Sequence, residues 1–257
     1  MIEQLFRELS ELPQIEAIAL GGSRASSHFD DHSDYDVYLY CTAPIPEDIR
    51  RNLLGKYCSY LEISNQFWEL EDNGTLNNGI DIDILYRDLN SFCEGIAHVV
   101  ERHQPYNGYT TCMWHNLRTC RIIYDPNGRL AAAKERFDVP YPAELKAAIL
   151  ERSWKLLRTS MPAYELQLTK AAKRCDLVSI NHRTSAFLES YFDLLFALNE
   201  QTHPGEKRLM QLCREKCSIL PADFEKNLNT LFLHLFTSPD SIPGDLDRIL
   251  TELAKLL

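Results

Sequence analysis

Long apolar runs are missing from this 257-residue sequence, and so is any CxxC pair. Without a run of about 20 apolar residues, the chain is not expected to span a membrane. Its eight cysteines are scattered without zinc-finger spacing, which favours reduced, buried thiols over a disulfide framework. The N-terminal segment also lacks the basic start and the apolar stretch of a secretory signal, so a cytoplasmic location is expected.

Positive charge is in short supply as well. Lys and Arg number 27 against 37 Asp and Glu, which gives a formal net charge of −10. Binding to a long nucleic acid depends on clustered Lys and Arg that displace counterions, so such a partner is not expected. Two common nucleotide-binding motifs, GxxxxGK[ST] and GxGxxG, are absent too. These absences exclude a P-loop and a dinucleotide-binding fold.

The composition is that of an ordinary globular protein, and its pattern changes near residue 140. Before that point strand and helix signals alternate, whereas amphipathic helices follow one another beyond it. The expected class is α+β, with a mixed-sheet domain at 1–140 and an α-helical bundle domain at 141–257. Within the first domain, strands are expected at 14–20, 37–41 and 80–87, helices at 2–12, 46–54 and 89–102, and a turn at 71–79.

A glycine-rich turn follows the first expected strand, in the sequence GGSR at 21–24. A strand that runs into Gly-Gly-Ser and then a short helix leaves backbone N–H groups pointing out of the turn. Glycine also lets an anion approach the backbone closely. The segment therefore predicts a phosphate cradle, with Arg24 as a candidate to neutralise phosphate charge.

Four aspartates lie within the seven residues 30–36, directly ahead of the next strand. The first two are expected in a solvated loop, whereas Asp34 and Asp36 are two residues apart and should project from one face of the strand. Adjacent carboxylates repel each other unless a cation lies between them, and Mg2+ prefers such oxygen ligands. A third carboxylate from the strand IDIDILYR, Asp81 or Asp83, would complete a two-metal site.

This order of motifs resembles the signature of the DNA polymerase beta-type nucleotidyltransferase superfamily. The shared features are a strand, Gly-Gly-Ser, about a dozen residues, Asp-x-Asp in a strand, and a later strand with an acid between apolar residues. With its helical second half, the chain is similar to the bacterial small-molecule nucleotidyltransferases, which include enzymes that adenylylate aminoglycosides and lincosamides. The motifs cover residues 15 to 90; the helical half matches in general architecture.

The resemblance implies attack of a small molecule's hydroxyl on the α-phosphate of a nucleoside triphosphate, with release of pyrophosphate. ATP is the nucleotide that the family leads us to expect. Gly22 and Ser23 would contact the triphosphate, and Asp34 and Asp36 would hold two Mg2+ ions.

The third carboxylate and the general base are less clearly marked. Asp83 is preferred over Asp81 because the ILYR that follows it better matches the family's apolar run. Glu189, on an otherwise apolar expected helix, is the candidate base, with a structural acid as the alternative. Lys207, expected in the first turns of a helix that begins near residue 204, is a candidate for contacting an anion, because a cation there opposes the helix dipole.

Two other functions remain open from the sequence. The chain could be a non-catalytic nucleotide-binding protein of the same fold, such as one partner of a toxin–antitoxin pair. It could also modify a protein or a transfer RNA, although the acidic charge weakens the RNA version. The acceptor and the oligomeric state are not indicated by any motif.

Overall fold

The computed structural model describes residues 1–25, 33–67 and 69–257. The chain divides into two compact units, the first comprising 1–97 with 116–139 and the second 98–115 with 140–257. The sequence prediction had placed all of 1–140 in the first domain. Segment 98–115 belongs to the second unit instead. A hydrogen bond within that unit holds its backbone, because Ser190 Oγ donates to the Asn107 carbonyl at 2.6 Å.

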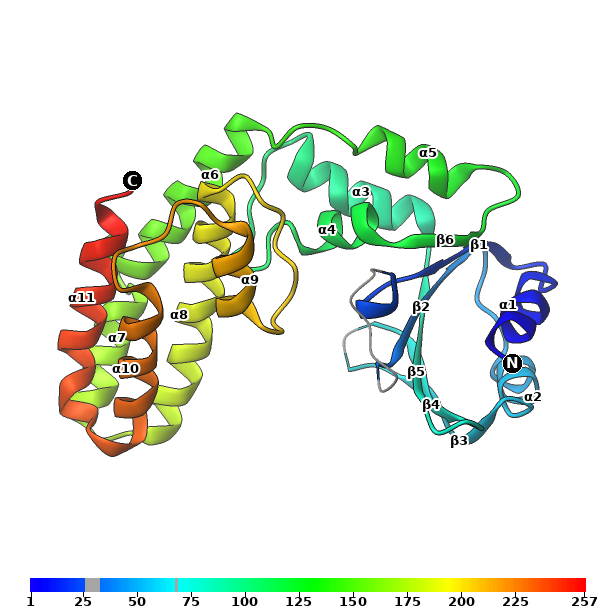
Figure 1. The fold of residues 1–257 in the computed structure, drawn as a ribbon, viewed down its shortest axis with the longest axis horizontal. Coiled ribbons are helices and arrows are strands. Elements are labelled where there is room, and N and C mark those ends of the chain that lie inside the picture. The colour runs from blue at the N-terminus through cyan, green and yellow to red at the C-terminus, as the bar shows by residue number, and fades with distance from the viewer. Residues whose placement is uncertain (26–32, 68) are drawn as a thin grey trace. The chain divides into compact units, whose positions relative to one another are not determined.

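The first unit is built on a six-stranded mixed sheet in the order β3-β4-β5-β2-β1-β6 (Figure 1). Strands β2 and β5 pair in parallel, and the other neighbouring strands pair in antiparallel. The strands are β1 Ile15–Leu20, β2 Tyr35–Cys41, β3 Cys58–Asn65, β4 Glu71–Leu76, β5 Asp81–Arg87 and β6 Arg121–Tyr124. The α+β class expected from the sequence is confirmed.

Helices cover the sheet and form the second unit. Those at the sheet are α1 Ile2–Ser10, α2 Glu47–Leu54, α3 Leu89–Val100, α4 Cys112–Thr119 and α5 Arg129–Arg136. Those of the second unit are α6 Ala143–Trp154, α7 Tyr164–Lys173, α8 Leu177–Leu198, α9 Leu209–Lys216, α10 Phe224–Thr237 and α11 Ile242–Ala254. The expected helical bundle is confirmed, and no helix within the described part of the chain is both long and apolar enough to cross a bilayer.

Alternation along β2 separates the two faces of the sheet. Val37 and Leu39 point into a buried core that α1 and α2 complete. The residues that alternate with them along the strand face the other way, where the ring of Tyr40 packs against Phe92 of α3 at a centroid distance of 5.6 Å. Asp36 has the same parity as Tyr40, so it lies on the face opposite the apolar core.

Residues 71–76 form strand β4, which corrects the sequence prediction of a turn at 71–79. The sequence of the segment is EDNGTL, in which Leu76 is the one large apolar residue, and its composition is typical of turns. Pairing with β3 on one side and β5 on the other supplies the backbone partners that local sequence cannot reveal. The actual turn follows at Gly79, whose φ is +83°.

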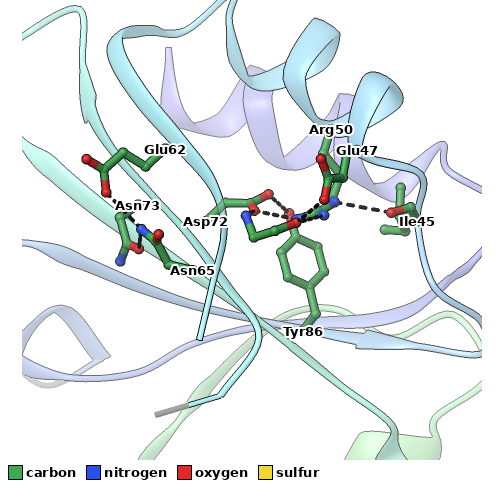
Figure 2. Close-up of polar contacts among 9 residues, drawn as sticks. Ile45, Glu47, Arg50, Glu62, Asn65, Asp72, Asn73 and Tyr86 are labelled. Atoms are coloured by element: carbon green, nitrogen blue, oxygen red, sulfur yellow. Dashed lines mark hydrogen bonds and ion pairs between the residues drawn. The ribbon is translucent and has the colours of Figure 1, made fainter. Parts of the chain in front are cut away.

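A buried ion pair anchors β4 to α2 on the apolar side of the sheet (Figure 2). Arg50 and Asp72 contact each other with side-chain exposures of 5% and 0%. Asp72 also accepts from the Tyr86 hydroxyl at 2.7 Å and from the Ser64 backbone N–H at 2.9 Å. Burial raises the pKa of Tyr86, which keeps this phenol protonated as a donor. Each carboxylate oxygen of Asp72 therefore has a partner, as a buried charge requires.

Replacing Asp72 with Ala should destabilise the chain by about 3–5 kcal/mol, because it leaves the Arg50 guanidinium buried without its counter-charge. Urea unfolding followed by circular dichroism measures the change. Lys155→Ala, which removes an ion pair exposed on both sides, is the control and should leave the midpoint nearly unchanged. Equal, small effects of both variants would contradict the anchoring role.

Candidate active site

The glycine turn after β1 lies directly against the start of β2. The Gly21 N–H donates to the Asp36 carbonyl at 2.8 Å, and Gly22 adopts φ +58°. A Cβ added to Gly22 would lie 1.7 Å from Asp36 Oδ2, so any other residue at this left-handed position would displace the Asp36 carboxylate. A single 3₁₀ turn, Ser23–Ala25, follows. The turn thus brings bare backbone to the edge of an acidic cluster.

Three carboxylates meet beside this turn. Asp34, Asp36 and Asp83 are half-buried, and one oxygen of each lies within 4.8 Å of those of the other two. Asp36 and Asp83 are direct partners in the parallel ladder of β2 and β5, so their side chains project from the same face. Asp34 immediately precedes strand β2, two residues before Asp36, and its carboxylate joins the other two. The sheet register therefore creates the cluster that the sequence spacing predicts.

The alternative third acid, Asp81, lies outside this cluster. It is exposed at the beginning of β5 and accepts a hydrogen bond from Thr75 Oγ1 at 2.8 Å. Asp83, two residues further along the strand, is the one that the parallel register places opposite Asp36. Of the two acids that the sequence left open, the structure brings the preferred one to the site.

The donor set of the cluster fits a hard divalent cation. Three carboxylates this close repel one another, and partial burial weakens the solvent screening that would otherwise reduce the repulsion. Carboxylate oxygens are the ligands that Mg2+ takes, commonly together with water and substrate phosphates. Asp34, Asp36 and Asp83 could therefore hold Mg2+, and no thiol or imidazole belongs to the set.

Arg24 is engaged with residues that lead into β2. Its Nε donates to the Ser33 carbonyl at 2.6 Å, and its guanidinium lies 4.1 Å from the centroid of the Tyr35 ring. Residues 26–32, which include Asp30 and Asp31, lie outside the described residues. A contact between Arg24 and phosphate stays a prediction.

The sequence reasoning missed a polar group that continues the acidic face along the sheet. The Tyr38 hydroxyl accepts from Asn116 Nδ2 at 2.6 Å, and the Arg87 guanidinium lies 4.2 Å from the centroid of the Tyr38 ring. Arg87 is held by two 2.7 Å hydrogen bonds to Glu69. Burial raises the pKa of Tyr38 to about 12, so its hydroxyl stays protonated. The shared parity of Asp36 and Tyr38 was the signal that could have found it.

Glu189 and Lys207 lie in the second unit. Glu189 is half-buried on α8, and burial raises the pKa of its carboxyl, although His182 opposes this shift. Gly108 packs so tightly on it that a Cβ there would lie 2.7 Å from the Glu189 Cβ. Lys207 is exposed in the turn before α9, which begins at residue 209. The prediction that Lys207 lies in the first turns of this helix is therefore wrong, because the helix begins after Arg208 adopts φ +57°.

Asp193, one turn beyond Glu189 on α8, has a structural role. It is 1% exposed and accepts from the Thr110 backbone N–H at 2.9 Å and from Thr110 Oγ1 at 2.6 Å. Burial raises the pKa of Asp193 from an ordinary 3.8 to about 6, while the bonds from Thr110 oppose the shift. This contact holds segment 98–115 on α8.

Comparison with known proteins gives a match to one family model and similarities to solved structures, two of which follow. A domain of unknown function (DUF4037) matches residues 109–209, less than half of the chain. A nucleotidyltransferase-like protein from Exiguobacterium sibiricum 255-15 is 13% identical with a TM-score of 0.42, covering 100% of this chain and 74% of that one. An aminoglycoside 6-adenyltransferase from Bacillus subtilis is 8% identical with a TM-score of 0.29, covering 100% and 89%. No curated protein matches in sequence. Similarities this weak carry no argument about substrate or activity.

The raised pKa of Asp193 predicts a pH-dependent stability. Because the folded chain binds this proton more tightly than the unfolded chain, the contribution is fully present below pH 3.8 and is lost as pH rises through about 6. The shift corresponds to about 3 kcal/mol. Asp193→Asn keeps an acceptor for Thr110 and removes the titration. Urea unfolding between pH 4 and pH 7 should therefore show a downward slope in the wild type that the variant lacks; parallel curves would contradict this assignment.

Proposed function

We propose that this chain is a Mg2+-dependent nucleotidyltransferase that moves a nucleoside monophosphate, AMP from ATP, onto a hydroxyl of a small molecule. The observation that carries the proposal is the cluster of Asp34, Asp36 and Asp83 beside a glycine turn. Neither feature alone is specific, since glycine turns and exposed acids are common. Their juxtaposition supplies a place for phosphate oxygens next to ligands for the cations that accompany them.

Each part of the site has a distinct task in this proposal. The three aspartates would hold two Mg2+ ions, and Gly22 keeps side-chain atoms out of the space next to Asp36. The backbone around Gly22 and Ser23 would accept the triphosphate, with Arg24 as a further candidate for a phosphate contact. When bound, the ions would neutralise charge on the triphosphate and on the departing pyrophosphate.

The reaction is an in-line substitution at phosphorus. The acceptor's hydroxyl oxygen forms a bond to the α-phosphorus, and the bond from that phosphorus to the bridging oxygen breaks, so pyrophosphate leaves with the electron pair. The hydroxyl proton must go to a base, and we assign that role to Glu189. Burial raises the pKa of the Glu189 carboxyl, which makes it a stronger base than an ordinary glutamate.

Calorimetric titration with ATP tests the proposal. Binding should require Mg2+, and Asp36→Asn should weaken it by about a hundredfold or more, because one of three carboxylates loses its charge. Asp81→Asn is the matched control, since it removes the same charge from the same part of the sheet outside the cluster. An ATP affinity that does not depend on Mg2+, or that is equal in the two variants, would contradict the proposed enzymatic activity. The alternative, a non-catalytic nucleotide-binding protein, would then be favoured.

Pyrophosphate release then identifies the acceptor. Small molecules that bear hydroxyls should support release by the wild type and by Asp81→Asn but not by Asp36→Asn. Release that occurs only with a protein or a transfer RNA would show that the acceptor class is wrong while the transfer chemistry stands.

A second prediction concerns the glycine turn. Gly22→Ala would place a Cβ 1.7 Å from Asp36 Oδ2 and should weaken binding of ATP with Mg2+ at least tenfold. Gly79→Ala is the matched control: it has the same left-handed strain, at φ +83°, but no atom within 4 Å of the added Cβ. Both variants should lose about 1 kcal/mol of stability from strain. A binding loss shared by both would assign the effect to strain rather than to Asp36.

A further inference from the structure

We propose that Asn73 is the positioning residue for the third carboxylate: it holds one oxygen of Asp83 so that the other is presented to the cation. Asn73 Nδ2 donates to Asp83 Oδ1 at 2.7 Å, and the two residues are direct partners in the antiparallel ladder of β4 and β5. Asp83 thus lies between two strands, with Asp36 on one side and Asn73 on the other. The inference rests on the proposed function, since it assigns a role toward the same cation.

A chain of hydrogen bonds fixes which end of the Asn73 amide meets Asp83. Figure 2 shows the part of this chain that joins Glu62, Asn65 and Asn73. Asn65 Nδ2 donates to Asn73 Oδ1 at 2.7 Å and to Glu62 Oε2 at 2.9 Å. An ionised carboxylate can only accept, so Glu62 and Asp83 both require an amide nitrogen. Reversing Asn73 would set its oxygen against Asp83 and its nitrogen against the nitrogen of Asn65. The order of donors is therefore determined from both ends of the chain.

The opposite face of β4 holds Asn73 in place. Its neighbour Asp72 points to the apolar side of the sheet, where it takes part in the buried contact with Arg50 and in the bond from the Ser64 backbone. Successive residues of a strand point to opposite faces, so fixing Asp72 on one face fixes Asn73 on the other. Figure 2 shows these two groups of contacts on neighbouring residues of the strand.

Holding one oxygen of Asp83 lowers the cost of binding a cation in two ways. A carboxylate restricted by a neutral donor loses less side-chain freedom when the cation binds. A neutral amide next to Asp83 also adds no fourth negative charge to the cluster, which a carboxylate at that position would do. Partners of ligating carboxylates commonly change metal affinity by about 10–100-fold.

The chain contains a matched control for this hydrogen bond. Two residues along β4, Thr75 Oγ1 donates to Asp81 Oδ1 at 2.8 Å across the same ladder, to an acid outside the cluster. Asn73→Ala and Thr75→Ala each remove one donor to one aspartate of β5. The Thr75 pair also shows that a threonine at such a position can donate to the acid opposite, so Asn73→Thr is the conservative variant that should restore the bond.

The test is calorimetric titration of each full-length variant with Mn2+, which takes the same oxygen ligands as Mg2+, in the absence of nucleotide. Asn73→Ala should bind Mn2+ at least tenfold more weakly than the wild type. Thr75→Ala should stay within about twofold, and Asn73→Thr should recover most of the lost affinity. Asn65→Ala leaves Asn73 in place but frees its amide to turn, so it should show an intermediate loss of Mn2+ affinity. This variant replaces Asn73→Ala in the test if Asn73→Ala fails to fold.

The outcomes separate this inference from the proposed function. If the wild type binds no Mn2+, the metal site and the proposed function fail together. The metal site stands if the wild type and Asp81→Asn bind Mn2+ and Asp36→Asn does not. If Asn73→Ala then binds Mn2+ with the affinity of the wild type, the role of Asn73 alone is overturned. In steady-state assays, a positioning role should raise the Mg2+ concentration at half-maximal rate and leave the rate at saturating Mg2+ within a few-fold. Equal losses in Asn73→Ala and Thr75→Ala would assign the effect to the strand rather than to Asp83.

Discussion

The parallel pairing of β2 with β5 is the constraint on which the rest of the site depends. It sets Asp36 beside Asp83 on one face of the sheet, and Asp34, the residue immediately before β2, joins them. Three carboxylates so close repel one another wherever they are ionised together.

Several neighbouring features make sense as consequences of that crowding. The turn after β1 has glycine where any side chain would collide with Asp36. The partner of Asp83 on the other side is a neutral amide, Asn73, rather than a further acid. On the opposite face of the same strand, the buried contact between Arg50 and Asp72 ties β4 to α2. The charged residues on the face opposite the acidic cluster, Arg50 and Asp72, therefore neutralise each other.

The sequence predicted the elements whose patterns are local. The apolar strands β1 and β5, the Gly-Gly turn, the two-residue spacing of Asp34 and Asp36 and the helices beyond residue 140 all have strong periodic or turn signals. It failed for β4, because EDNGTL becomes a strand only through partners supplied by β3, β5 and α2. Asn73 was missed for the same reason, since its role depends on a register across the sheet.

The second unit shows a similar limit. Its helices follow from amphipathic spacing, but the attachment of segment 98–115 depends on the buried Asp193 and on Ser190, both far away in sequence. The choice of Asp83 over Asp81 likewise needed the register to bring one acid, and not the other, opposite Asp36. Contacts between residues far apart in the sequence thus determine features that the spacing of residues along the chain cannot predict.

The number of Mn2+ ions bound per chain, measured by electron paramagnetic resonance with a non-hydrolysable ATP analogue present, tests the central claim most directly. The account predicts two ions in the wild type and a loss of binding in Asp83→Asn, because the three aspartates act as one ligand set. No bound ion in the wild type, or the same number in Asp83→Asn, would contradict it.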